Sequence, residues 1–493
     1  MRSVLIGIKR IFIVLCSLYL VLLIPDCNEK KPLVVPKATA FSWNKDSLWN
    51  QLEQNFAYAL SLSKDSLQQL VVLKSQIAEN RLNSISDSAL PFDAPVFDSL
   101  LNDFLAISPL VAASSDSNNW YFTHYNQLRR FIKLQSRNWA VKEPVVRNRL
   151  YSFLYGTRAA VEEVLLQKKD TSVPDLNMLD TIPSSTPSAH ILGVPVHSGD
   201  LLVSRGGAEV SAFISRGNNY PGNFSHVALL YVDGQTGKPW VVEAHIEKGV
   251  AVSDIDTYIR DKKLRFMVLR PYPGLPLIQQ DPLLPHKAAK AAYDATFSRH
   301  IPYDFCMNAN DTTAMFCSEV AATAYRKYGI GFWSAPSTIT QTGVVDWLND
   351  FGVRYFETQM PSDLEYDPQL GIVAEWKDQA TLQKDHQDNA MMDALLEQAN
   401  AGRKLNYNTW LLPVARLLKA WSVCMNLMGK EGIIPEGMGA TQALKNEYFT
   451  NLHKSGIKQL QQKADAFRLQ KGYAAPYWQL LAMSREVLSK DIP

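Results

Sequence analysis

The sequence predicts an α+β protein in which a central domain of strands and helices lies between two helical regions. Before about residue 170, apolar residues recur at the three- and four-residue spacing of helices. From about residue 191, short β-branched and aromatic runs are bounded by Gly, Pro and Asp, which is typical of strands. Helical spacing returns beyond about residue 385. A chain of 493 residues with 46% hydrophobic content is long enough for roughly two to four structural units.

The first 27 residues have the composition of a targeting segment. MRSVLIGIKR carries three basic residues, and the apolar run IFIVLCSLYLVLLI follows it. A basic start and a short apolar core predict a secretory signal or a signal-anchor. No A-x-A-like cleavage site follows, and Pro25 and Asp26 fit poorly with lipid modification of Cys27. We expect an exported, periplasmic or membrane-anchored envelope protein, with residues 1–27 retaining it at a membrane in preference to complete cleavage.

The next two segments are a helical region at 40–170 and a linker at 171–190. Leu52, Phe56 and Leu60 lie at helical spacing, and a similar pattern resumes after the polar loop SSDSNN. The linker is rich in Pro, Ser and Thr. Nothing in the helical region identifies a partner, and its aromatic residues are the kind that usually fill a core.

The central domain, 191–380, contains most of the predicted strands. They are GDLLVSR, HVALLYV, PWVVEAH, LRFMVLRPY and IVAEWKD, in that order. DGQTGK (233–238) lies between the second and third and predicts a hairpin loop. Helical spacing is present at 284–299 and again after Cys317.

The last segment, 385–493, is predicted to be helical throughout. Within it, WLLPVARLLKAWSVCMNLM (410–428) approaches the length of a membrane span. Because Pro413, Arg416 and Lys419 interrupt this run, a buried or interfacial helix is the favoured interpretation. The two helical regions could cover the central domain as a lid, or they could form a platform for a partner.

The charge and cysteine content exclude several classes of function. A formal net charge of +2 provides no basic field, so nucleic-acid binding is not expected. Of the five cysteines, Cys306, Cys317 and Cys424 lie outside the targeting segment, and an odd number in an exported protein suggests a free thiol. No spacing of Cys or His suits a structural zinc site, and we expect no cofactor.

Cys317 is the candidate nucleophile. It lies in AMFCSEVAATAY, where a turn-like segment precedes it and small apolar residues follow at helical spacing. This arrangement predicts a cysteine in the first helical turn, where unpaired N–H groups and the helix dipole favour negative charge. A single cysteine in an apolar context is nevertheless most often structural.

His226 and Glu243 are the candidate base and orienting acid. If DGQTGK closes a symmetric hairpin, His226 lies directly opposite Glu243, with Cβ atoms about 5 Å apart. A carboxylate beside an imidazole can fix its tautomer and stabilise its cation. Without Cys317 this pair would be equally consistent with an ordinary cross-strand contact.

Four neighbouring residues have competing interpretations. Cys306 lacks the small-residue helix that follows Cys317, so it is the weaker nucleophile candidate. His245 shares a strand face with Glu243 and could replace His226 or adjust the site, although a satisfied polar role is simpler. Asp200 suits a turn, and Glu319 suits a carboxylate favoured by the helix dipole.

Five stretches in this order resemble the circularly permuted papain-like amidases, the YiiX-like branch related to NlpC-type cell-wall hydrolases. They are GDLLVSR, SHVALLYV, VVEAH, YDFCMNANDTTAMFCSEVAATAY and SDLEYDP. In unpermuted relatives the nucleophilic cysteine lies upstream of the histidine-bearing sheet. The permuted branch has the order histidine, acid, cysteine, as this sequence does. The resemblance covers about residues 190–380 and implies a small antiparallel sheet or barrel packed on helices.

Carried over by position, the resemblance implies Cys317 as nucleophile, His226 as base and Glu243 as orienting acid. Tyr303 matches an active-site tyrosine of the family, which implies a polar contact near the oxyanion. The Cys317 N–H would also stabilise the oxyanion. The implied activity is hydrolysis of an amide in a peptide-like substrate, such as a cell-wall peptide. Lipid acyl hydrolysis or acyl transfer, known in lecithin:retinol acyltransferase-like relatives, and a non-catalytic envelope scaffold are the alternatives.

Overall fold

The computed structural model describes most of the chain. The described residues are 10, 13–14, 16–24, 41, 45–85, 88–114, 119–168, 175–206, 208–260 and 263–490. Our expectations for Pro25, Asp26 and Cys27 lie outside these residues. The described residues between 10 and 22 are helical.

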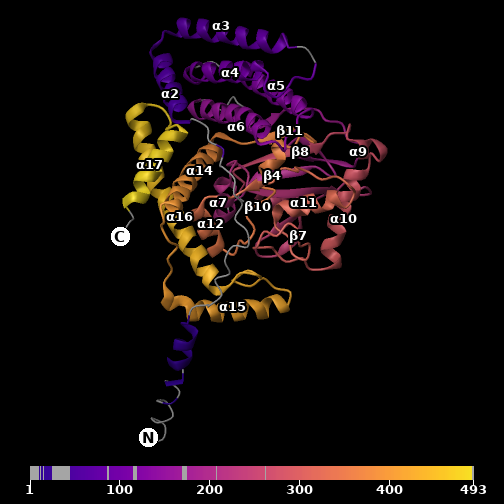
Figure 1. Cartoon of the computed structure of the whole chain (residues 1–493), viewed down its shortest axis with the longest axis vertical. Coiled ribbons are helices and arrows are strands. Elements are labelled where there is room, and N and C mark those ends of the chain that lie inside the picture. Colours follow the sequence, from indigo (N-terminus) through magenta and orange to yellow (C-terminus); the bar gives the residue numbers. More distant parts are fainter. Residues whose placement is uncertain are drawn as a thin grey trace.

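A seven-stranded antiparallel sheet forms the centre of the molecule, with helical regions on two sides of it (Figure 1). Its order is β1-β11-β8-β4-β5-β6-β7. The strands are β1 (Leu176–Met178), β4 (Leu201–Arg205), β5 (His226–Val232), β6 (Pro239–His245), β7 (Gly249–Asp254), β8 (Arg265–Pro271) and β11 (Leu370–Trp376). This arrangement confirms the predicted α+β class.

Two strands of this sheet were not predicted. β7 follows β6 through a short turn in which Gly249 has φ +73°, and it pairs with β6 along its length. β1 lies within the segment that we expected to be a linker, and it extends the sheet by pairing with β11. Two small two-stranded sheets also occur, β2 (Ser188–Ile191) with β3 (Val194–His197) and β9 (Ser337–Thr338) with β10 (Glu357–Thr358). The domain boundaries themselves stay a prediction.

The N-terminal region is a helical layer against the β11 side of the sheet (Figure 1). Its helices are α2 (Lys45–Ser61), α3 (Lys64–Asn83), α4 (Pro95–Ala113), α5 (Asn119–Ser136) and α6 (Pro144–Gln167). Among the described residues, α4 alone is long and apolar enough to cross a membrane, and more than half of it is buried within this layer. Its apolar side chains therefore serve as the core of the region.

The central helices pack close to the sheet. They are α7 (Glu209–Gly217), α8 (Ile255–Arg260), α9 (Pro276–Gln280), α10 (Leu284–Ser298), α11 (Cys317–Arg326), α12 (Thr342–Asp350) and α13 (Asp363–Tyr366). α10 and α11 pack against β5 and β6, and they share an apolar core with alternate residues of β4, β5 and β8. This packing holds the start of α11 beside the start of β5.

The C-terminal region continues directly from β11. Its elements are α14 (Gln379–Asn400), a short 3₁₀ turn (Thr409–Leu411), α15 (Leu412–Leu427), α16 (Ala440–Lys471) and α17 (Tyr477–Lys490). α14 packs with α12, α16 and α17 in one large apolar cluster. α15 lies across one end of the molecule and contacts the beginning of α16 (Figure 1).

Candidate active site

Cys317 is the first residue of α11, as the sequence predicts. Phe316 before it is extended, and its backbone N–H donates to Glu319 Oε2 at 3.0 Å. This contact caps the helix start, and the N–H of Cys317 has no acceptor within the helix because Cys317 is its first residue. The thiol is 8% exposed, and Cys317 Sγ lies 3.9 Å from the carbonyl oxygen of Ser225.

His226 begins β5, one residue after Ser225, and lies beside Glu243 of β6. The predicted register is wrong by two residues, because the ladder pairs Glu243 with Ala228 and not with His226. The DGQTGK loop is thus less symmetric than the hairpin arithmetic assumed. A shift of two residues keeps both side chains on one face. The two side chains still meet diagonally, with His226 Nε2 2.6 Å from Glu243 Oε2.

The second oxygen of Glu243 has partners that the sequence did not reveal. Ser253 Oγ of β7 donates to Glu243 Oε1 at 3.1 Å, and His245 Nε2 lies 3.3 Å from the same oxygen. Ser253 was missed because β7 was missed, although the alternating run GVAVSD carried a weak strand signal. Three side chains, one from each of β5, β6 and β7, therefore hold the carboxylate in place.

Hydrogen bonding controls the ionisation of the histidine and the glutamate. Burial by itself would lower the pKa of His226, but hydrogen bonds with Cys317 and Glu243 and the charge of Glu243 outweigh it and raise that pKa to about 9. Burial would raise the pKa of Glu243, and the two histidines instead bring it below its ordinary value. At neutral pH the pair is an imidazolium and a carboxylate.

Cys317 and His226 lie side by side in the cleft, and Cys317 contributes to the raised pKa of His226. Since Nε2 of the ring is held by Glu243, Nδ1 is the nitrogen that remains for the thiol. The imidazole and the carboxylate are in direct contact, and Cys317 Sγ lies 3.9 Å from the carbonyl oxygen of Ser225, the residue before His226. This is the arrangement that a cysteine nucleophile with an oriented base requires.

Tyr303 lies in the same cleft. It forms a single parallel bridge with Met315, which places it beside the strand-like approach to α11. Burial and the nearby Cys317 raise the pKa of Tyr303 well above its ordinary value, so its hydroxyl keeps its proton. A neutral phenol near the thiol can donate a hydrogen bond to an oxygen of a bound substrate.

A cleft of about 950 Å³ contains all four predicted site residues. The sheet side of this cleft supplies Ser225, His226, Glu243, His245, Tyr303 and Cys317. The opposite side is formed by residues of the C-terminal region, among them Ala415, Leu418, Ile433, Ile434, Met438 and Thr450. The C-terminal helices thus narrow the access to the thiol, which the sequence left open.

The competing residues have other positions. Cys306 has an exposed side chain and is not among the residues that line the cleft. Asp200 is buried and forms a two-oxygen ion pair with Arg270, so it does more than turn the chain. Glu319 closes the start of α11, and its burial raises its pKa to about 8. Among the described residues, no group of three or more His, Cys, Asp or Glu is arranged to hold a metal ion.

A comparison with known protein families matches the segment that contains His226, Glu243 and Cys317. Residues 195–374 match the family described as permuted papain-like amidase enzyme, YaeF/YiiX, C92 family. This segment is therefore similar to a permuted papain-like amidase domain. The match includes the whole histidine–acid–cysteine series and excludes both helical regions. No curated protein and no solved structure matches the chain.

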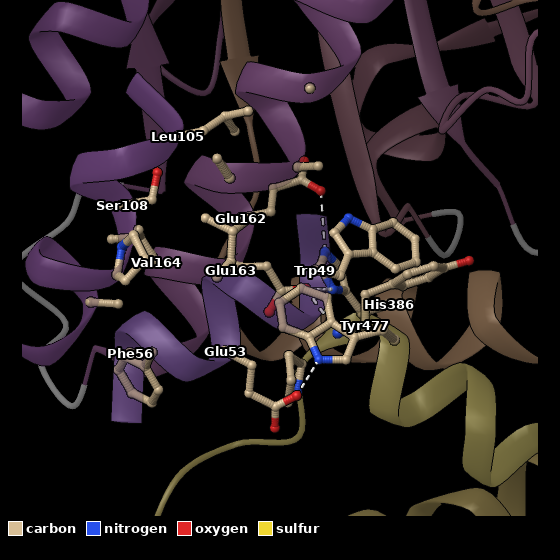
Figure 2. Close-up of a pocket in the computed structure, with 18 of the residues that line it drawn as sticks. Trp49, Glu53, Phe56, Leu105, Ser108, Glu162, Glu163, Val164, His386 and Tyr477 are labelled. Atoms are coloured by element: carbon tan, nitrogen blue, oxygen red, sulfur yellow. Dashed lines mark hydrogen bonds and ion pairs between the residues drawn. The ribbon is translucent and has the colours of Figure 1, made fainter. Parts of the chain in front are cut away.

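A second, smaller cavity lies away from the amidase domain's cleft. Figure 2 shows its aromatic and aliphatic side chains around the carboxylates of Glu53, Glu162 and Glu163. It encloses about 100 Å³ between the N-terminal helices and α17. His386 Nε2 lies 3.2 Å from Glu162 Oε2, and Trp478 Nε1 donates to Glu53 Oε2 at 2.5 Å. These contacts join two helical regions, and none of them involves a thiol or hydroxyl nucleophile.

Proposed function

We propose that this protein is a cysteine amidase or peptidase that hydrolyses an amide in peptide-like substrates through Cys317, His226 and Glu243. One observation carries the proposal. The buried Cys317 at the start of α11 shares a cleft with His226, whose Nε2 lies 2.6 Å from a buried carboxylate, and Cys317 and Glu243 together raise the pKa of His226. The match to an amidase family supports the reaction class.

The first half of the reaction transfers the acyl group to sulfur. The proton of the Cys317 thiol is held by His226 as imidazolium, and the resulting thiolate attacks the amide carbonyl carbon while the carbonyl π electrons move to oxygen to give a tetrahedral oxyanion. The N–H of Cys317 and the Tyr303 hydroxyl are the donors we assign to that oxygen. Imidazolium of His226 then gives its proton to the departing nitrogen, the C–N bond breaks, and a thioester remains.

The second half of the reaction returns the enzyme to its starting state. His226, now neutral, takes a proton from water as the water oxygen attacks the thioester carbon. The C–S bond then breaks, the carboxylic acid is released, and sulfur and His226 regain the thiolate–imidazolium pair. Glu243 keeps the imidazole oriented and stabilises its cation in both halves.

The setting we propose is the cell envelope. The basic and apolar composition of residues 1–27 supports export with retention at a membrane. Peptide-like envelope material, such as cell-wall peptides, would then be within reach of the cleft.

The reactivity of Cys317 tests the mechanism. We expect alkylation of Cys317 to be faster near neutral pH than alkylation of a free peptide thiol, and to lose this advantage in His226→Ala. Cys306→Ala is the matched control, because that thiol is exposed and outside the cleft. Reactivity equal to that of a peptide thiol, with no dependence on His226, would contradict the proposed series and favour a scaffold.

The products distinguish the substrates. Purified envelope fractions should release peptide amines with the wild type and none with Cys317→Ala. Release of free fatty acid without new amines would indicate that the protein is a lipid acyl hydrolase and not a peptidase.

A further inference from the structure

An apolar surface covers the outer side of the segment around α15. More than half of the exposed large apolar side chains in the described residues lie in this segment or in the N-terminal run. Those in the first group, here called the α15 surface, are Trp410, Leu411, Val414, Leu417, Leu418, Trp421, Val423, Leu427, Met428 and Ile433. Exposed apolar residues gathered in this way mark an interaction surface.

The helix geometry places four exposed residues of this segment on one side of α15. Leu417, Trp421, Cys424 and Met428 follow at intervals of four, three and four residues, and all four are exposed. The opposite side of α15 is buried against α16, through a small cluster that includes Leu412. The exposed stripe is therefore left over after α15 has packed on the protein.

The described N-terminal residues leave the molecule from this surface. Tyr19 Oη donates to the carbonyl oxygen of Trp410 at 2.6 Å, and Arg416 Nη1 donates to that of Leu22 at 2.8 Å. The helix to which Tyr19 and Leu22 belong points away from the body of the protein, whereas α15 lies across its end (Figure 1). An anchor that entered a bilayer here would bring α15 to the bilayer surface.

The charge of the segment fits an anionic surface. Residues 403–430 contain five basic side chains and no acidic one. The next acidic residue along the chain, Glu431, lies 3.1 Å from Lys248, and of the five basic residues Lys404 lies 3.4 Å from Asp346. Basic residues near a membrane each contribute about 1 kcal/mol of attraction to anionic lipids, and exposed tryptophans favour the headgroup region. Apolar side chains, tryptophans and positive charge together describe an interfacial helix.

The α15 surface also reaches the mouth of the catalytic cleft. Leu418 and Ile433 belong to both, and Ile433 is 68% exposed. Ile434 and Met438 continue the apolar wall inward and are buried. A molecule held in the bilayer would thus meet a continuous apolar path from the α15 surface into the cleft.

We propose that the α15 surface docks on an anionic lipid bilayer, and that the cleft accepts amide substrates that carry a lipid anchor in that bilayer. The docking stands on the surface alone, whereas the substrate class rests on the proposed amidase function.

Cys424 allows a direct test of docking in the full chain. The variant Leu469→Cys adds a reference thiol on an exposed site of α16, roughly 40 Å along that helix from its start beside α15. Labelling by a water-soluble maleimide is followed at each site by peptide mass mapping. Vesicles of phosphatidylglycerol and phosphatidylcholine should slow the labelling of Cys424 about tenfold and leave the labelling rate at residue 469 unchanged. Vesicles of phosphatidylcholine alone should have a weaker effect.

Two outcomes would overturn docking. In one, Cys424 is labelled at the rate seen without vesicles although the protein sediments with them. This result would mean that the N-terminal segment alone binds the membrane. In the other, Cys424 is protected without vesicles and more so at higher protein concentration, so that a second copy covers the surface.

A pair of substrates tests the substrate class. Leu417→Asp/Leu427→Asp should lower turnover of a lipid-anchored peptide amide in vesicles about tenfold while turnover of its soluble fragment stays near that of the wild type. Leu469→Asp, which adds a charge at an equally exposed site, should change neither. Equal turnover of the anchored amide by the double variant and the wild type would overturn the inference. A wild type inactive on both amides would instead refute the amidase function and leave the Cys424 result standing.

Discussion

The two helical regions look alike in sequence but contribute differently to the molecule. The C-terminal region leaves a cleft of about 950 Å³ between itself and the sheet, whereas the N-terminal layer and α17 enclose a cavity of only about 100 Å³. The cleft contains a thiol and an imidazole that is paired with a carboxylate, and the cavity contains carboxylates that are paired with neighbouring helices. The difference shows that a helical region acquires a role from the groups it faces, and amphipathic spacing does not reveal those groups.

Buried charge is the main feature of the N-terminal contact with the sheet. Arg129 of α5 lies between Glu365 and Glu375, at 3.3 and 2.8 Å, and Arg158 of α6 pairs with Glu365 as well. All four side chains are almost completely buried. Such a network holds one arrangement of helices and strands, because any displacement would leave a buried charge without its partner.

The largest expected effect is the loss of activity when the Cys317 thiol is removed from the cleft beside the C-terminal region. Cys317→Ala should lower kcat/KM by about 10⁴-fold or more, because no other group can form the thioester. Steady-state assays of amide hydrolysis measure the loss, and circular dichroism checks that the fold is kept. Cys306→Ala is the matched control and should retain nearly full activity. Loss of activity in Cys306→Ala, with Cys317 still reactive, would identify Cys306 as the nucleophile in place of Cys317.

The next effect tests the N-terminal contact. Glu365→Gln removes a charge that two buried arginines share, and we expect it to lower the free energy of unfolding by about 3–5 kcal/mol. Denaturant titration measures this change. Glu397→Gln breaks an exposed pair with Arg485 and should lower the same quantity by about 1 kcal/mol or less. Equal effects in the two variants would show that the buried network does not lock the layer.

The pH dependence of the free energy of unfolding tests the raised pKa of His226 in the cleft. Because the pKa of His226 is raised to about 9, its stabilising interactions are complete below the unfolded value of about 6.5 and are lost as pH rises through about 9. The stability difference between the wild type and His226→Gln should therefore shrink by about 3 kcal/mol from about pH 6 to about pH 10. Thermal or denaturant unfolding at several pH values follows it. His300→Gln, at an exposed pair with Glu436, should show little such change.

The smallest effect concerns the wall of the cleft. Met438→Ala widens the side formed by the C-terminal region, and we expect it to change the preference between bulky and small substrates by about tenfold or less. Competition assays with paired peptide amides measure the ratio. Leu469→Ala, far from the cleft, should leave it unchanged. An unaltered preference in Met438→Ala would mean that the C-terminal wall does not contact the substrate.

Much of the catalytic series was predictable because its signals are local. The helix start at Cys317 follows from a turn and small residues, and the His226 and Glu243 strands follow from alternating runs around a turn. Their contact was predicted for an inexact reason, since the register differs by two residues and only the shared face was right. Ser253 and the contact of His245 with Glu243 depend on a third strand and on a packing distance, which alternation alone does not supply.

By itself the sequence determined the order of helical and strand segments, the α+β class and the candidates for the reactive groups. These properties depend on backbone periodicity and on side-chain chemistry, which are present in any short window. Only the tertiary structure decided which helices form the cleft wall and which apolar stripe stays exposed. Cys317 meets Ser225 across 92 residues, and Ile433 reaches the same cleft from still farther along the chain. Such approaches result from packing over the whole molecule, because many chain paths share the same local pattern and only one buries its apolar faces while keeping its buried charges paired.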